Sequence, residues 1–184
     1  RYADFDMHAL LPMTRLCLEY AVRVRLAAQR PGIPAMAERA ARELSWRLPG
    51  AETRLDALDF GIPQSIGEFA VTAFPTSHDA PGSCGFRLDA AGGAVGVLTD
   101  TGYVTDEAAD ILEGVDLAVL EANHDIETLR SGPYPYYLKQ RILGAQGHLS
   151  NEDAARFAAV LAQSGTSEII LAHLSRENNT PAMA

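Results

Sequence analysis

The chain has 184 residues, of which 47% are hydrophobic and 21% charged, and its formal net charge is −9. This length can bury a sizeable core and this composition is typical of a globular protein, so we expect a single domain over residues 1–184, with no stretch apolar enough to span a membrane. The acidic balance argues against a protein that holds nucleic acid by phosphate neutralisation alone, although bound divalent ions can supply the positive charge in a nucleic-acid enzyme.

The first part of the chain has helical patterns. Met13–Gln29 is an Arg-rich amphipathic segment, and Pro34–Leu48 is a second helix candidate that ends at a Pro-Gly pair. The first segment favours a helix packed on the domain, with binding to a membrane surface as the alternative. Cys17 and Cys84 lie far apart without Cys-x-x-Cys spacing, which favours buried thiols in a cytoplasmic protein.

After residue 60 the pattern changes to short strands, turns and helices. Phe69–Phe74 and Gly85–Leu88 predict paired strands, and Ala91-Gly92-Gly93 predicts a hairpin turn before a strand from Val95. Alternating strands and helices follow and predict a layered α/β domain. The expected elements are a helix over Thr105–Leu112 capped by Thr105, a strand over Leu117–Leu120, two short helices within 125–143 split by Gly132–Pro135, a helix over Ser150–Gln163 capped by Ser150, and a strand over Ile169–Ala172.

Three of these apolar runs end in a residue that can bind metal or move protons. The run from Val95 leads into Asp100, the run from Leu117 into Glu121, and the run from Ile169 into His173. Active sites in layered α/β proteins gather at the sheet edge where strands end. These three residues therefore predict a site at one edge of the sheet.

Four of the five histidines, His78, His124, His148 and His173, lie in short polar segments. Each alone is more often structural than catalytic, and Asp100 alone could be a turn residue before Gly102. Together, imidazoles and a carboxylate suit Zn, Mn or Fe, and an aspartate can bridge two ions in a hydrolytic site. The sequence contains no rival His-Glu-x-x-His, phosphate-loop, Gly-x-Ser-x-Gly or four-cysteine motif.

From about Phe60 to its end, the chain resembles the metallo-β-lactamase-fold hydrolases, specifically the YycJ/WalJ-like branch related to ribonuclease Z. The resemblance is weak or absent over residues 1–59. The segments that carry it are Thr76–Ala80, Leu98–Val104, Glu121–Asp125 with Leu129, Tyr134-Pro135 with Leu138-Lys139 and Arg141-Ile142, Gly147–Ala155, and Leu171–Ser175 with Asn178-Asn179.

The resemblance implies a metallo-β-lactamase αββα sandwich, here truncated at its N-terminus. It implies metal ligands at His78, Asp100 and His173, with Asp100 bridging two ions of Zn or Mn. It implies that His148 is catalytic rather than a ligand, contacting the scissile phosphate or its leaving group. Residues that it places around the ligands or at the substrate are Glu121, His124, Asp125, Lys139 and Arg141.

The activity implied by the resemblance is phosphodiester hydrolysis by a metal-bound hydroxide, as in a 5′–3′ exonuclease acting on DNA. Tyr134, Tyr136 and Tyr137 could then stack on bases while Lys139 and Arg141 meet phosphate; the alternative is that they pack the loop and are solvated. A (thio)ester hydrolase on the same fold is a second hypothesis.

One departure from the family favours a third hypothesis, an inactive fragment. The family's His-x-His-x-Asp-His string, which supplies most metal ligands, does not occur, and His8 is the only histidine before His78. We therefore expect this segment to be missing or altered within residues 1–30, which leaves metal occupancy open.

Overall fold

The computed structural model describes residues 58–66, 68–80 and 82–184. The chain divides into two compact units, Arg1–Asp59 and Phe60–Ala184, and the fold below is that of the second unit. The helices predicted over Met13–Gln29 and Pro34–Leu48 lie outside the described residues. Those expectations, and that of one domain over the whole chain, stay predictions.

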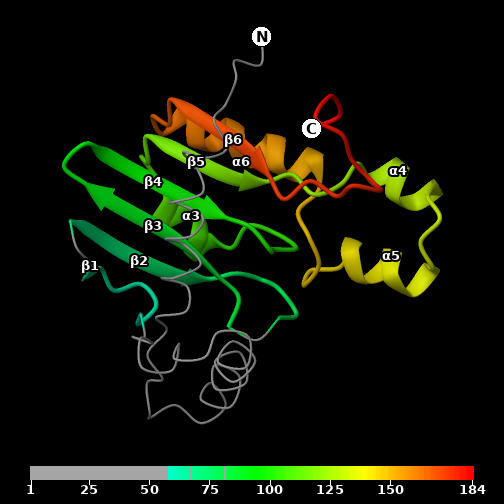
Figure 1. Ribbon diagram of the computed structural model, residues 1–184, viewed down its shortest axis with the longest axis horizontal. Helices are drawn as coiled ribbons and strands as arrows, with labels where there is room; N and C mark the ends of the chain where they lie inside the picture. Colours follow the sequence, from blue (N-terminus) through cyan, green and yellow to red (C-terminus); the bar gives the residue numbers. More distant parts are fainter. Residues whose placement is uncertain (1–57, 67, 81) are drawn as a thin grey trace, which may run out of the picture. The chain divides into compact units, whose positions relative to one another are not determined.

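Six strands of the described part of the chain form one sheet, and their order in space follows the sequence (Figure 1). The first four strands pair antiparallel, and the last two join them in parallel. The strand bounds are β1 Gln64–Ile66, β2 Phe69–Pro75, β3 Cys84–Ala90, β4 Gly93–Leu98, β5 Leu117–Glu121 and β6 Glu168–Ala172. The sequence did not predict β1, which is three residues long and therefore too short to show an alternating pattern.

The turn between β3 and β4 is the hairpin that the sequence predicts. Ala90 pairs with Gly93, so Ala91 and Gly92 form a two-residue loop. Gly93 has φ 136°, a conformation that side-chain-bearing residues rarely adopt. The hairpin lies at the edge of the sheet where β4 begins.

Four helices fill the two parallel crossovers (Figure 1). The hydroxyl of Thr105 accepts from the backbone N–H of Ala108 at the start of α3, and that of Ser150 accepts from Asp153 at the start of α6, so both predicted caps are confirmed. The helix bounds are α3 Asp106–Leu112 between β4 and β5, and α4 Ile126–Ser131, α5 Tyr136–Leu143 and α6 Asn151–Gln163 between β5 and β6. Among the described residues, no helix is long and apolar enough to cross a membrane.

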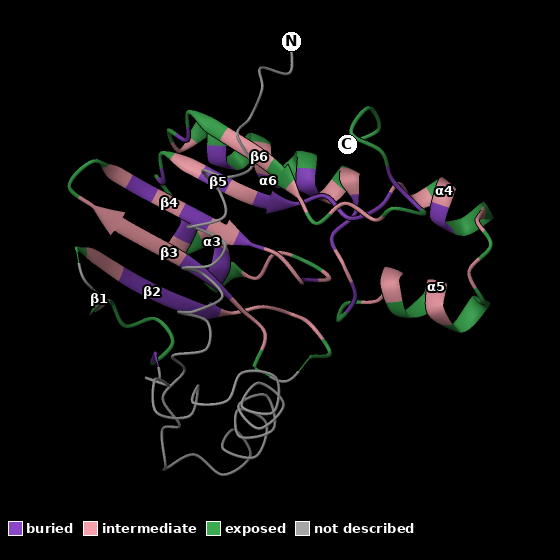
Figure 2. Cartoon of the chain, in the orientation of Figure 1, coloured by how far each residue is buried: buried purple, intermediate pink, exposed green. Residues whose placement is uncertain are grey.

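The core lies between one face of the sheet and the helices α3 and α6 (Figure 2). Alternate residues of β4 and β5 face these helices, and their apolar side chains exclude water from the layer. Its fully or nearly fully buried members are Phe74, Ala94, Leu98, Ala108, Leu112, Val115, Ala118, Leu120, Ala122, Leu149, Ala154, Phe157 and Leu161.

The other face of the sheet is also apolar. Val71, Ala73 and Phe86 alternate with the core-facing residues of β2 and β3, and all three are buried. A sheet with two apolar faces belongs inside a layered sandwich, because each face must be covered. The described residues thus supply a β layer and one α layer of the predicted αββα arrangement.

The pairing pattern brings four strand ends to one edge. β2 is antiparallel to β3 and β3 to β4, so β2 runs parallel to β4, β5 and β6. The carboxyl ends of β2, β4, β5 and β6 therefore meet at the edge opposite the β3–β4 turn. The segments that follow them carry His78, Asp100, Glu121 and His173.

Candidate metal centre

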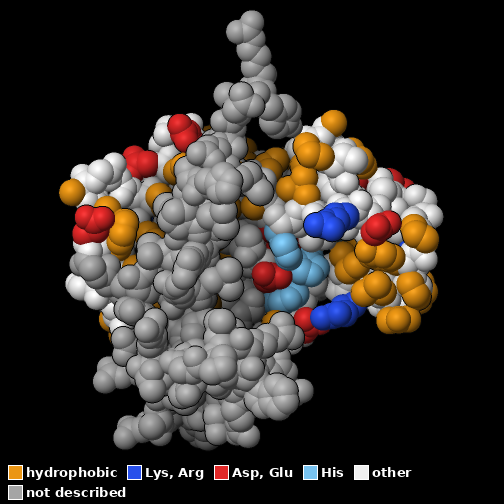
Figure 3. All heavy atoms as spheres, viewed as in Figure 1, with side chains coloured by type: hydrophobic (Ala, Val, Ile, Leu, Met, Phe, Trp, Pro, Cys, Tyr) orange, Lys and Arg blue, Asp and Glu red, His pale blue; other side chains and the backbone are white. Residues whose placement is uncertain are grey.

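Five predicted site residues converge at this edge. His78 follows β2, Asp100 follows β4, Glu121 ends β5, His173 follows β6, and His148 lies in the loop before α6. Figure 3 shows histidine side chains gathered with acidic ones in a hollow of the surface. The ring centroid of His148 lies 4.9 Å from that of His78 and 5.1 Å from that of His173, so the three imidazoles are neighbours.

The Asp100 carboxylate lies at the centre of this group. Its Oδ1 is 3.7 Å from Nε2 of His78, 3.9 Å from Nδ1 of His148 and 3.8 Å from Nδ1 of His173. These separations are too long for hydrogen bonds. Two ligand atoms bound at ~2.0–2.2 Å to one ion can be at most about 4.4 Å apart, so the spacing of Asp100 Oδ1 and His78 Nε2 suits a shared cation.

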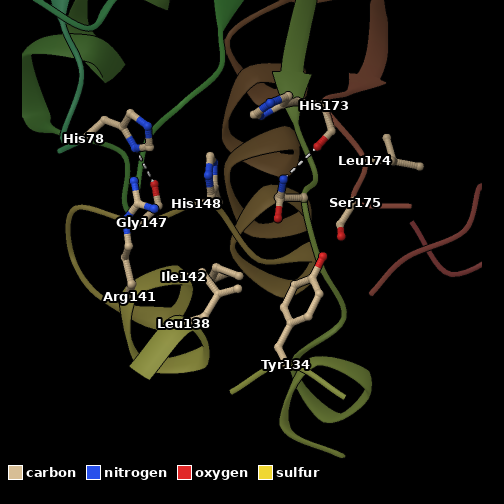
Figure 4. A pocket seen from close by; sticks show the side chains of 11 residues that line it. His78, Tyr134, Leu138, Arg141, Ile142, Gly147, His148, His173, Leu174 and Ser175 are labelled. Carbon is tan, nitrogen blue, oxygen red and sulfur yellow. Dashed lines mark hydrogen bonds between the residues drawn. The ribbon is translucent and has the colours of Figure 1, made fainter. Parts of the chain in front are cut away.

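A backbone carbonyl orients the ring of His78. Its Nδ1 lies 2.9 Å from the carbonyl oxygen of Gly147 (Figure 4). Because a carbonyl only accepts, Nδ1 carries the hydrogen and Nε2, which faces Asp100, keeps its lone pair. This arrangement is typical of a histidine that ligates metal, whose other nitrogen is fixed by a carbonyl or carboxylate.

Glu121 forms hydrogen bonds with the other two histidines, His148 and His173. Its side chain is fully buried, and its Oε1 lies 2.8 Å from Nδ1 of His148 and 2.7 Å from Nδ1 of His173. Its Oε2 accepts from the backbone N–H of Thr101 at 2.9 Å. Burial alone would raise the pKa of Glu121, but the hydrogen bonds from both histidines and Thr101 outweigh burial and bring the pKa to about 2.

The ionised Glu121 fixes the tautomers of its partners. Since the carboxylate only accepts, the Nδ1 atoms of His148 and His173 carry the hydrogens, which leaves Nε2 of each ring as the open nitrogen. The hydrogen bond to Glu121 also raises the pKa of His173, against the opposing effect of its burial. The buried Glu121 carboxylate thus stabilises positive charge at the rings of His148 and His173, whether from a proton or from a bound cation.

Two candidate ligands have unusual backbones. Asp100 and His173 have φ of 56° and 57°, in the left-handed region that few non-glycine residues adopt. The amide of Asn123 donates to the carbonyl oxygen of His173 at 2.8 Å. The backbone N–H of Thr101, the residue after Asp100, donates to the Glu121 carboxylate. Such conformations persist where the surroundings hold them, and they concentrate at functional sites.

Two further predicted residues lie beside the cluster rather than in it. His124 is buried, and neither ring nitrogen has a hydrogen-bond partner among the described residues. Burial lowers its pKa, so the ring is neutral at pH 7. Asp125 is the N-cap of α4: its side chain accepts from the N–H of Thr128 at 2.7 Å.

The two predicted cations of α5 have partners within the protein. Lys139 donates through Nζ to the carbonyl oxygens of Arg130 and Gly132 at 2.6 and 2.7 Å, so it joins α5 to the end of α4. Arg141 forms a bidentate ion pair with Asp79: its Nε donates to Oδ2 at 2.5 Å and its Nη2 donates to Oδ1 at 2.9 Å. The hydrogen bond from Arg141 lowers the pKa of Asp79, so this carboxylate is ionised beside His78.

A pocket of about 290 Å³ opens over the cluster (Figure 4). One side is formed by His78, His148 and His173, and the facing side by α5 and the loop before it. Its remaining lining residues are Asn123, Tyr134, Leu138, Arg141, Ile142, Gly147, Leu174 and Ser175. Arg141 is therefore the predicted substrate cation that lines the pocket.

Gly147, Asn123 and Asp79 contribute to the site although the sequence predicted no role for them. Gly147 acts through its carbonyl, Asn123 through an amide bonded to a backbone oxygen, and Asp79 through a partner 62 positions away. Their positions in the sequence could have indicated them, because each lies within two residues of a predicted site residue.

The chain matches the Beta-lactamase superfamily domain over residues 16–174 and belongs to that family. Its fold is the metallo-β-lactamase fold, whose members depend on metal, and the residues present fit that requirement: a carboxylate oxygen lies within 4 Å of three imidazoles, two of which are oriented by a buried carboxylate.

The sequence is 44% identical over 126 residues to the exodeoxyribonuclease WalJ of Streptococcus pneumoniae, and this match covers 68% of the chain and 47% of that protein. It is 40% identical over 124 residues to the exodeoxyribonuclease YycJ of Bacillus anthracis, covering 67% of the chain and 47% of that protein. The chain thus spans about half the length of the curated relatives that it matches. In fold it is similar to a diphosphatase of the PhnP family, with a TM-score of 0.50 and 16% identity over 77% of this chain and 46% of that one.

Proposed function

We propose that this protein is a metal-dependent hydrolase that cleaves phosphodiester bonds in DNA, as a 5′–3′ exonuclease. The single observation that carries the proposal is the placement of Asp100 Oδ1 3.7 Å from Nε2 of His78, with the rings of His148 and His173 beside the same carboxylate oxygen. The similarity to two exodeoxyribonucleases supports DNA as the substrate. His78, Asp100 and His173 would hold the metal, which we propose to be two divalent ions, Zn or Mn.

Bound divalent ions would supply Lewis-acid activation of water and of phosphoryl oxygens. The chain's own residues would hold these ions, orient the histidines and transfer a proton. Asp100 and His78 would hold a divalent ion beside the pocket, because Oδ1 of Asp100 and Nε2 of His78 lie 3.7 Å apart. Glu121 would keep His173 and His148 in the correct tautomer through their Nδ1–H groups.

His148 would deliver a proton to the leaving oxygen. Its Nδ1 is held by the ionised Glu121, so Nε2 is the nitrogen left to carry a proton toward substrate in the pocket. The Glu121 carboxylate stabilises the imidazolium before transfer, as a buried acid does behind a catalytic histidine. We assign Glu121 a positioning role for this reason.

The remaining predicted substrate residues are assigned by their contacts. Arg141 lines the pocket and uses two of its five N–H donors on Asp79, so it retains donors for phosphate. We propose that Lys139 and Asp125 act indirectly, by joining α5 to α4 and capping α4. His124 would support the cluster as a neutral buried ring.

The test is hydrolysis of end-labelled single-stranded DNA by the purified protein after loading with Mn²⁺ or Zn²⁺, with a short acyl thioester as the competing substrate. We expect release of nucleotides from the 5′ end, and loss of this activity in Asp100→Ala. Faster turnover of the thioester than of DNA would favour the (thio)ester hydrolase. Absence of bound metal together with no hydrolysis would favour the inactive fragment.

A further inference from the structure

The pocket has two chemically different sides. His78, His148 and His173 form the polar side described above. The facing side is formed by Tyr134 and by Leu138 and Ile142, which are four residues apart on α5 and therefore share one face of that helix (Figure 4). A phosphate held by the histidines would thus have an aromatic and aliphatic surface beside it.

The three tyrosines of this segment have different positions. Tyr134 is half-buried and lines the pocket, whereas Tyr136 and Tyr137 are 77% and 74% exposed and do not line it. On a helix with 100° between residues, Tyr136 lies about 160° around the axis from Leu138 and about 120° from Ile142. Of the three, Tyr134 is the ring that a substrate bound at the cluster would meet.

We propose that Tyr134, Leu138 and Ile142 form a subsite for one unpaired nucleobase next to the phosphate being hydrolysed. This inference rests on the proposed function and specifies how its substrate is held. A nucleobase is the expected occupant because this surface lines the same pocket as the three histidines, where the phosphate would bind. The pocket volume of about 290 Å³ is near the lower end of the ~300–1,000 Å³ typical of small-ligand pockets. That volume can accommodate a single nucleobase.

The surface formed by Tyr134, Leu138 and Ile142 predicts that the subsite accepts any of the four bases. An aromatic face can stack with any base, and aliphatic side chains contribute no hydrogen bonds to a base edge. Two polar neighbours form hydrogen bonds within the protein: the Asn123 amide donates to the His173 carbonyl oxygen, and the Ser175 hydroxyl oxygen accepts from Asn178. The subsite would therefore require an unpaired terminal base without distinguishing strongly between the four.

The experiment uses a single-stranded oligonucleotide with 2-aminopurine at its 5′ end and a phosphorothioate at the first linkage, mixed with the metal-loaded protein. Stacking quenches 2-aminopurine fluorescence, so quenching reports on the subsite without turnover. We expect quenching with the wild type and with Tyr134→Phe, and loss of quenching with Tyr134→Ala. Tyr136→Ala is the matched control and should quench as the wild type does.

A second arm compares oligonucleotides with and without the terminal base. We expect Tyr134→Ala to weaken binding of the normal oligonucleotide by roughly tenfold to a hundredfold, the usual range for one stacked base, and to leave the abasic one unchanged. Equal losses for both oligonucleotides, or equal effects of Tyr136→Ala and Tyr134→Ala, would overturn the subsite. Failure of the wild type to hydrolyse DNA would instead overturn the proposed function.

Discussion

At the scale of single residues, the site depends on one buried carboxylate. Glu121 accepts from His148, His173 and the backbone of Thr101, so three parts of the site share one anion. An unpaired buried charge would be costly, and a hydrogen-bonded one instead fixes its partners. This explains why Glu121, which lines no part of the pocket, controls the orientation of residues that do.

This carboxylate predicts a specific loss of stability in acid. The pKa of Glu121 falls from its usual 4.5 to about 2 in the folded protein, so its contribution, about 3 kcal/mol, is present above pH 4.5 and is lost as pH falls toward 2. In metal-free protein, Glu121→Gln should remove this part of the pH dependence, measured as the urea midpoint between pH 6 and pH 3. Glu127→Gln, at an 81% exposed side chain, is the control and should retain the wild-type slope.

His148 and Asp100 should respond differently to removal of their side chains. Because Glu121 holds His148 while Asp100 faces all three imidazoles, we expect His148→Ala to keep the metal content and to slow turnover by ~10²-fold or more. Metal analysis and single-turnover DNA hydrolysis measure the two quantities. Loss of bound metal in His148→Ala would assign the ring to the ligand set instead.

At the scale of elements, the site is assembled by loops that approach one another very closely. A Cβ added to Gly147 would lie 2.1 Å from the carbonyl oxygen of Ile142, and one added to Gly102 would lie 2.3 Å from that of Ala145. Both clashes are with backbone, which cannot turn aside as a side chain can. The loops that carry His148 and Asp100 therefore require glycine beside them.

Gly147→Ala should accordingly disturb both fold and site. We expect a destabilisation of about 1–3 kcal/mol, the usual range for overpacking, together with weaker metal binding, because Gly147 also accepts from His78. Gly92→Ala is the matched control, since a Cβ there meets nothing within 4 Å. Thermal melts and metal titrations of the two variants provide the comparison, and equal behaviour would contradict the close approach.

Elements of this protein differ in how far the sequence predicts them. α6 and α3 were predicted with their caps, because Ser150 and Thr105 act on N–H groups three residues away. β1 was not predicted, because its pairing with β2 is its main support. The different surroundings of Tyr134 and Tyr136 were also beyond the sequence, since they depend on where α5 packs.

At the scale of the whole molecule, the proposed ligands are spread across nearly one hundred residues of chain. His78, Asp100 and His173 meet because four parallel strand ends share one edge of the sheet. The strand-end pattern predicted that Asp100 and His173 converge, and the family resemblance added His78; the distances to Asp100 show that the three residues are neighbours. The hydrogen bonds that orient His78 and His173 needed the folded structure.

A site formed only on folding predicts that metal stabilises the folded state. At a free-ion concentration one hundred times Kd, linkage gives about 2.7 kcal/mol, or about 5–11 °C in Tm for a chain of this size. We expect Mn²⁺ or Zn²⁺ to raise Tm and EDTA to reverse the increase. Asp100→Ala should abolish the shift, whereas Asp110→Ala, on the exposed side of α3, should keep it. An unchanged shift in Asp100→Ala would exclude this carboxylate as a ligand.

The two-residue turn between β3 and β4 has a practical consequence. It lies at the sheet edge away from the histidines, Gly92 is exposed, and a Cβ added there meets nothing within 4 Å apart from its chain neighbours. A cysteine introduced at Gly92 would give a handle for a fluorophore or a surface tether. Single molecules could then be immobilised through the edge of the sheet opposite the pocket.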